Sequence, residues 1–130
     1  MHARANIASL SPKGEAFPRS SRVRARRDFR AAYENGVKHH GRLVAVFAKP
    51  RAEGGLRLGL TATRKAGGAV VRNRARRRVR EIFRRWAATA AHVDVDLVVN
   101  ISERATRSPF AALSSEVTAL FSRAAADARK

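Results

Sequence analysis

The stretch from Leu56 to Glu81 reads LRLGLTATRKAGGAVVRNRARRRVRE and contains two different periodicities. Up to Thr63 its apolar residues alternate with polar or small ones, which predicts a half-buried strand. After the connector Lys65-Ala66-Gly67-Gly68, apolar residues recur at helical spacing instead. We therefore expect a strand that leads directly into a long helix, residues 69–90. The apolar stripe of this helix consists of Val71, Ala75, Val79, Ile82, Phe83, Trp86 and Ala90.

The residues before this stretch predict a helix and a second strand. Asp28 is a suitable N-cap and Gly36 a suitable C-terminal stop for the helix. Residues 43–49 form a continuous apolar run of strand length. A glycine-containing turn separates this run from residues 56–63, so we expect the two strands to form an antiparallel hairpin. A fourth strand could come from a split of the same region.

The residues after the long helix predict one more strand and one more helix. Residues 93–101 alternate between apolar and mostly polar side chains. Ser108-Pro109 is a typical helix start, with Ser as the N-cap and Pro at the first helical position. The fold class is therefore α+β, with helices packed on one sheet. We expect one domain, residues 22–123, between a flexible N-terminal tail (1–21) and a frayed C-terminal tail (124–130).

The composition indicates an anionic partner. The 130 residues include 28 Lys and Arg against 10 Asp and Glu, a net charge of +18, and 23 of the basic residues are Arg. Such a charge suits nucleic acid, an anionic membrane surface or an acidic protein. The absence of Cys excludes disulfides and thiolate metal sites. The longest strongly apolar run, residues 43–48, is too short to span a membrane, and we expect a cytoplasmic protein.

The basic residues are concentrated in and just before the long helix, where Glu81 is the only acidic residue. Arginines four residues apart repel each other and oppose helix formation by roughly 0.2–0.5 kcal/mol per pair. A solvated helix face normally mixes charges of both signs, so we expect a polyanion to neutralise this basic face. A membrane is not expected, because the core needs the apolar stripe. The basic residues are Arg64, Lys65, Arg72, Arg74, Arg76, Arg77, Arg78, Arg80, Arg84 and Arg85.

Two further groups of residues are open to more than one interpretation. Phe29, Tyr33 and Phe47 could stack on unpaired bases if they are exposed, or belong to the core. Asp94 and Asp96 share one strand face and could bind a divalent ion, although such a pair is more often the solvent side of a strand. We find no catalytic motif, and therefore expect no catalytic residue in the protein itself.

The order of these residues resembles the bacterial ribonuclease P protein component. The resemblance rests on residues 56–65, Gly67 and residues 69–81, with Arg72-Asn73-Arg74 as its core. Upstream, it extends to Arg22, Asp28, Phe29, Tyr33 and Gly36. The resemblance implies a four-stranded sheet with three helices, a ribosomal-protein-S5-domain-2-like fold. It also implies a left-handed β-α-β crossover around the basic helix.

The resemblance further implies a function as the protein subunit of a ribonucleoprotein. The catalytic RNA would use divalent metal (Mg), and no cofactor would be bound tightly by the protein. The partners would be this RNA and precursor tRNA, whose 5′ leader the protein binds while assisting 5′ maturation. The RNA-binding residues implied by matching are Arg64, Lys65, Arg72, Asn73, Arg74, Arg76, Arg77 and Arg80. The implied leader-binding cleft consists of Phe29, Tyr33, Phe47, Thr61, Lys65 and Arg72.

Three other functions stay open on the residues alone. A ribosomal or RNA-assembly protein that binds structured RNA would have the same charge and size. A duplex-DNA module is less expected, because groove-reading helices usually present Asn, Gln and Ser beside Arg, and here only Asn73 would serve. A stand-alone metal nuclease would use Asp94 and Asp96.

Overall fold

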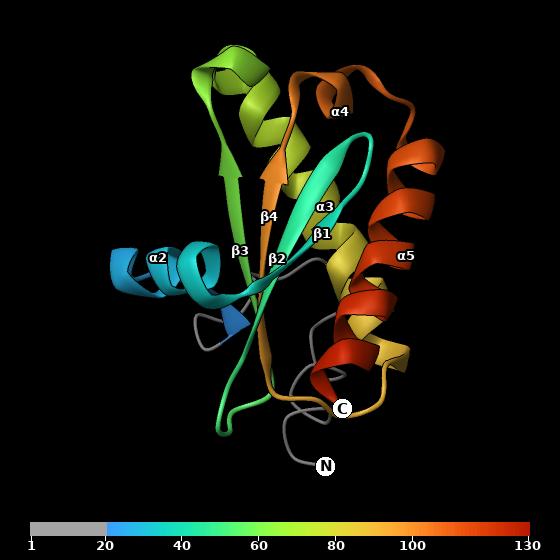
Figure 1. Cartoon of the computed structure of the whole chain (residues 1–130). Coiled ribbons are helices and arrows are strands. Elements are labelled where there is room, and N and C mark those ends of the chain that lie inside the picture. The colour runs from blue at the N-terminus through green and yellow to red at the C-terminus, as the bar shows by residue number, and fades with distance from the viewer. Residues whose placement is uncertain (1–20) are drawn as a thin grey trace.

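The computed structural model describes residues 21–130, so the expected N-terminal tail lies outside the described residues except for Ser21. The class is α+β, as predicted, with one four-stranded sheet (Figure 1). The elements are α2 (Arg26–Asn35), β1 (Val37–His40), β2 (Val44–Pro50), β3 (Leu56–Ala62), the short 3₁₀ helix η2 (Arg64–Ala66), α3 (Ala69–Thr89), β4 (Val95–Ile101), α4 (Glu103–Arg107) and α5 (Phe110–Ala128).

Strand β4 lies inside the sheet, whose order is β1-β2-β4-β3. It pairs antiparallel with β2 on one side and parallel with β3 on the other. The predicted hairpin between residues 43–49 and 56–63 is therefore wrong, because β4 separates these two strands. The physical reason is that β4 is buried on both faces, and a strand of this kind belongs in the interior of a sheet. The fourth strand is β1, which pairs antiparallel with β2.

The unit β3-α3-β4 is the crossover that the resemblance implies. Both strands point upward in Figure 1, with β4 to the right of β3 and α3 behind them. This arrangement is left-handed, whereas nearly all such crossovers are right-handed. The crossover places the N-terminus of α3 close after the end of β3, beyond the short helix η2.

Different helices cover the two faces of the sheet. Helices α3 and α5 pack on one face and form the main core, whose largest buried side chains include Phe83 and Phe121. Helix α2 lies on the other face, over a smaller cluster around Val98. The side chains of Phe29 and Phe47 pack against this second cluster and are only partly buried. No helix in residues 21–130 is long and apolar enough to cross a membrane.

Helix α2 begins earlier than predicted. Its N-cap is Ala25, and Asp28 lies in the first turn, where a carboxylate is favoured by the helix dipole. Asp28 Oδ2 lies 3.5 Å from Arg57 Nη2, so this carboxylate faces β3 and does not cap the helix. The helix ends at Gly36 as predicted, with the Gly36 N–H donating to the carbonyl of Ala32.

Helix α5 begins and ends later than predicted. Its N-cap is Pro109, and Ser108 instead ends the short helix α4, which the sequence did not predict. Helix α4 is stabilised at its N-terminus because the side chain of Ser102 accepts a hydrogen bond from the Ala105 N–H. The expected frayed tail from residue 124 is instead part of α5, which continues to Ala128 and buries Ala124 against the core.

Candidate nucleic-acid interface

Residues 72–80 of α3 present basic side chains that have no carboxylate partner among the residues that the structure describes. Ala75 and Val79 are buried against the sheet, so the opposite side of the helix faces solvent. In residues 21–130, no carboxylate lies within ion-pair distance of the basic side chains of this segment. Asn73 accepts a hydrogen bond from Arg76 at 2.9 Å. Arg78 of this segment donates to a backbone carbonyl. We call the other five, Arg72, Arg74, Arg76, Arg77 and Arg80, the free arginines.

The other three arginines of α3, Arg78, Arg84 and Arg85, have partners within the protein. Arg84 Nη2 and Arg85 Nε donate to Glu81 Oε2 at 2.6 and 2.7 Å. The hydrogen bond from Arg84 is the main reason that the pKa of Glu81 lies below its ordinary value. Arg78 Nη2 donates to the carbonyl of Ser108 at 2.7 Å, and burial lowers the pKa of Arg78. The positive charge available to a ligand is therefore concentrated in the free arginines between residues 72 and 80.

A groove of about 230 Å³ lies between α3 and the segment that precedes α2. Burial is the main cause that lowers the pKa of Arg80 below its ordinary value, and the nearby charges of Arg22, Arg76 and Arg77 add to it. A bound phosphate would relieve this repulsion. We call this site the arginine groove; it is lined by Val23, Phe29, Leu58 and Leu60 together with Arg22, Arg24, Arg76 and Arg80.

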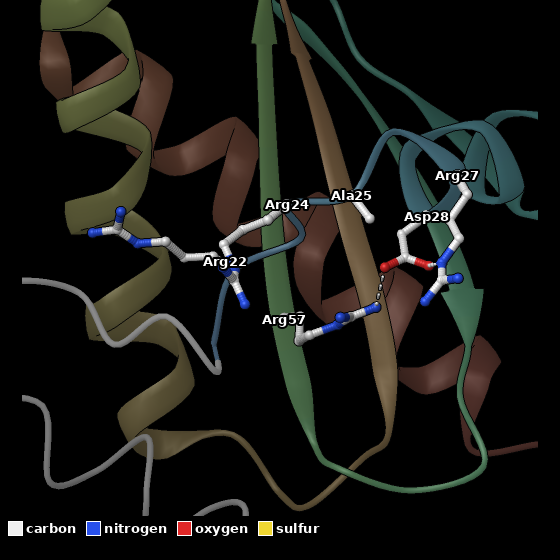
Figure 2. A pocket seen from close by; sticks show the side chains of 6 residues that line it. All are labelled: Arg22, Arg24, Ala25, Arg27, Asp28 and Arg57. Carbon is white, nitrogen blue, oxygen red and sulfur yellow. Dashed lines mark ion pairs between the residues drawn. The ribbon is translucent and has the colours of Figure 1, made fainter.

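A second pocket, of about 390 Å³, shares Arg22 and Arg24 with the arginine groove. Figure 2 shows Asp28 directed toward Arg57 across this pocket. Arg57 also donates two hydrogen bonds to Asp96, and the bond to Asp96 is the largest cause that raises the pKa of Arg57. The charge of Arg57 is therefore used within the protein. The remaining lining residues are Ala25 and Arg27.

The two acidic residues near the start of β4 have internal partners. Asp96 is buried, accepts two hydrogen bonds from Arg57 at 2.7 Å each and lies 3.5 Å from Arg51 Nε. Asp94 accepts a hydrogen bond from the Gly55 N–H at 2.7 Å, which is the main reason that its pKa is lowered. The interpretation of this pair as the solvent side of a strand is therefore wrong for Asp96. In residues 21–130, no three His, Asp or Glu side chains gather as metal ligands.

Aromatic and polar side chains gather where the end of α2 lies over the sheet. Tyr33 is 37% exposed, and its ring packs edge-to-face on Phe47, with ring centroids 4.9 Å apart. The Tyr33 hydroxyl donates to Asn100 Oδ1 at 2.8 Å and lies 3.1 Å from Thr61 Oγ1. Lys38 Nζ lies 5.6 Å from the centre of the Phe47 ring. We call these five residues the sheet patch; its rings, hydroxyls and cation suit single-stranded nucleic acid.

The structure distributes the residues predicted from the sequence over neighbouring sites. Phe29 lies in the arginine groove, whereas Tyr33, Phe47 and Thr61 lie in the sheet patch. Arg64 and Lys65 are exposed on η2. Within residues 21–130, no hydrogen bond, ion pair or ring contact joins Lys65 or Arg72 to the sheet patch.

Several residues of these sites were not among those predicted for a binding role, and two of them illustrate why. Asn100 belongs to the sheet patch, and Arg22 lines the arginine groove. Asn100 stands on the polar face of the predicted strand, but only the strand order places it opposite Thr61. Arg22 was part of a basic segment before the first helix, and its approach to α3 depends on tertiary packing.

Comparisons with known proteins agree on one family. Residues 17–125 match the family model described as Ribonuclease P. A ribonuclease P protein component from Desulfovibrio desulfuricans is 47% identical over 70 residues, which cover 52% of this chain and 54% of that relative. The one from Citrifermentans bemidjiense is 34% identical over 107 residues, covering 82% of this chain and 90% of the relative. The structure of the RNase P protein from Thermotoga maritima is 30% identical with a TM-score of 0.71, covering 78% of this chain and 96% of that one. Because the fold and most of the sequence match these proteins, this chain belongs to the ribonuclease P protein family.

Proposed function

We propose that this protein is the protein subunit of a cytoplasmic ribonuclease P ribonucleoprotein. In this role it binds the catalytic RNA and the 5′ leader of precursor tRNA, and it assists the endonucleolytic 5′ maturation of tRNA. The observation that carries the proposal is the set of free arginines on α3, which have no carboxylate partner in residues 21–130 and two of which, Arg76 and Arg80, line a groove together with apolar side chains.

The free arginines are suited to an RNA backbone. Arg72 and Arg80 are about 12 Å apart along the helix axis, at roughly 1.5 Å per residue, so the set can reach more than one phosphate. Each phosphate that an arginine neutralises releases condensed counterions, which makes the affinity fall steeply with salt. The residues that we assign to the catalytic RNA are Arg64, Lys65, Arg72, Asn73, Arg74, Arg76, Arg77 and Arg80.

The arginine groove and the sheet patch are suited to a single-stranded leader. Partly exposed rings stack on bases of any sequence, and nearby cations hold the phosphates. Tyr33 is exposed enough to stack, and Phe29 forms part of the groove floor. Such a surface tolerates leaders of different sequence. The residues that we assign to the leader are Phe29, Tyr33, Phe47, Thr61, Lys65 and Arg72.

We assign the hydrolytic chemistry to the catalytic RNA and its magnesium ions. The acidic residues near the start of β4 support this assignment, because Asp96 is engaged by Arg57 and Asp94 by a backbone N–H. Both carboxylates therefore have partners within the protein. The protein side chains bind and orient RNA, and they supply positive charge where phosphates approach.

The test compares precursor tRNA that carries a leader with mature tRNA. The affinity of the catalytic RNA for each is measured with and without the protein. We expect the protein to increase the affinity for the precursor and to leave that for mature tRNA nearly unchanged. Equal increases for both would contradict leader binding and would favour the alternative, a ribosomal or RNA-assembly protein that binds structured RNA.

A further inference from the structure

We infer that Asp28 is a positioning residue: its ion pair with Arg57 fixes the first turn of α2 on the sheet and thereby holds the Phe29 ring in the arginine groove. The inference rests on the proposed function, because it takes Phe29 to belong to the surface that binds the leader. Asp28 itself does not need to contact the leader, because it acts through the ring beside it.

Asp28 lies on a surface that is otherwise basic. Among the described residues that line the second pocket it is the one carboxylate, and Figure 2 shows it together with Arg22, Arg24, Arg27 and Arg57. A negative charge at this point weakens the attraction of the surface for a phosphate backbone. The charge of Asp28 therefore disfavours RNA binding in general, which points to a role in the structure of the protein itself.

Helix α2 has few apolar contacts that could fix its position. Ala32 is its only buried residue, and the cluster that Ala32 joins is small. The Tyr33 hydroxyl holds the last turn of the helix, because it lies within hydrogen-bonding distance of side chains on β3 and β4. At the first turn, Asp28 Oδ2 lies 3.5 Å from Arg57 Nη2. Within residues 21–130, this ion pair is the polar side-chain contact that joins the first turn to the sheet.

The Arg57 guanidinium is itself held in place, so it can determine the position of Asp28. Arg57 Nε and Nη2 donate to the two carboxylate oxygens of Asp96 at 2.7 Å each. Asp96 is buried and is the register partner of Arg57 on β4. A bidentate pair of this kind fixes the plane of the guanidinium. Asp28 therefore contacts a cation whose position is set by the sheet.

The residue after Asp28 is Phe29, whose ring lies directly on the backbone of β3. A Cβ atom at Gly59 would come within 2.9 Å of both Phe29 Cε1 and Val23 Cβ, so these two side chains fit only because Gly59 has none. The Phe29 ring is partly buried and lines the arginine groove. A displacement of the first turn of α2 would therefore move this ring away from β3.

The position of the ring affects how strongly it binds a single-stranded leader. A base that stacks on a ring already in place does not have to order that ring on binding, and such preorganisation increases affinity. Without the ion pair, the first turn of α2 is less constrained and part of the binding energy is used to order the ring. We therefore expect the ion pair to increase the affinity for precursor tRNA and not that for mature tRNA.

The experiment compares Asp28→Asn with Glu34→Gln in the complex of the protein with a ribonuclease P RNA. Both substitutions remove one negative charge from α2, but Glu34 is exposed and forms no ion pair within residues 21–130. The dissociation constants of precursor and mature tRNA are measured for each variant. We expect Asp28→Asn to reduce the preference for the precursor by about fivefold, the equivalent of roughly 1 kcal/mol. Glu34→Gln should leave this preference unchanged.

Two further measurements test whether Asp28 acts through Phe29. Phe29→Leu removes the ring, and adding Asp28→Asn to this variant should cause little further loss of preference, because the two residues act as one unit. In the free protein, one α-proton of Gly59 points toward the Phe29 ring, so the ring current changes its NMR chemical shift. We expect Asp28→Asn to alter this shift and Glu34→Gln to preserve it. Thermal unfolding checks that every variant is folded.

The possible results separate this inference from the proposed function. If Asp28→Asn keeps the wild-type preference, or lowers the affinity for precursor and mature tRNA equally, the inference is wrong and the proposed function stands. Losses from Asp28→Asn and Phe29→Leu that simply add, or an unchanged Gly59 shift in Asp28→Asn, would also overturn the inference alone. If the wild-type protein gives no preference for the precursor, both are wrong.

Discussion

Replacing Arg80 by Gln is expected to change the free protein and its RNA complex in opposite directions. Arg80 lies four and three residues after Arg76 and Arg77, and Arg22 approaches it across the arginine groove. Each like-charged helix pair costs about 0.2–0.5 kcal/mol, so removing two pairs should stabilise the free protein by about 0.4–1 kcal/mol at low salt. Higher salt should reduce this gain, because it screens the repulsion.

The same substitution should weaken RNA binding. If Arg80 neutralises one phosphate, the slope of log affinity against log salt concentration should become shallower by about 0.7–0.9. Urea unfolding of the free protein and fluorescence anisotropy of a labelled precursor tRNA, over a series of KCl concentrations, measure the two effects on the same preparation.

Arg78→Gln is the matched control on the same helix. Arg78 donates to the carbonyl of Ser108 and lies over the Phe110 ring, so its loss should destabilise the free protein by about 1.5 kcal/mol or more. The salt dependence of RNA binding should not change. If Arg80→Gln destabilised the protein as Arg78→Gln does and left the salt slope unchanged, the assignment of Arg80 to a phosphate would be refuted.

Three further predictions follow from other contacts. Asp96→Ala leaves Arg57 without its main partner and should lower the free energy of unfolding by about 3–5 kcal/mol in urea; a loss below about 1 kcal/mol would contradict the structural role of this pair. Tyr33→Ala should weaken binding of precursor tRNA but not of mature tRNA, and equal losses would mean that the ring serves only packing. Glu81→Gln should make the stability of the protein less sensitive to acid. Arg84 and Arg85 lower the pKa of Glu81 from 4.5. The contribution of Glu81 to the stability of the folded protein is therefore complete above pH 4.5 and is lost as the pH falls through the lowered pKa. Melting temperatures over a pH series check this, and an identical profile in the variant would count against it.

The helices and strands could be predicted from the sequence because their signals are local. The change of periodicity near residue 68 predicted both β3 and α3, and the latter was correct to within one residue at its C-terminal end. Strand pairing is not local. The hairpin prediction used the short turn between two strands, but β4 enters between them from more than thirty residues away. Val98, an apolar residue on the face predicted to be polar, was the one sign that β4 is buried on both sides.

In the candidate site, too, the features set by local spacing could be predicted and those set by tertiary packing could not. The concentration of arginines on one helix could be predicted, since it depends on spacing alone. It could not be predicted which of these arginines are available to a ligand, because the partner of Arg78 lies 30 residues away in the sequence. The sheet patch depends on strand order, since Thr61 and Asn100 are 39 residues apart and Tyr33 lies 67 residues from Asn100.

On the proposed function, the free arginines of α3 are neutralised by the RNA of a tRNA-processing complex. The most direct test measures the rate of 5′ cleavage of precursor tRNA by a ribonuclease P RNA at limiting magnesium, with and without this protein. We expect the protein to accelerate cleavage, and Arg72→Ala combined with Arg77→Ala to remove most of the gain. A cleavage rate that does not respond to the protein, at any salt concentration at which it binds the RNA, would refute the proposed role of these arginines.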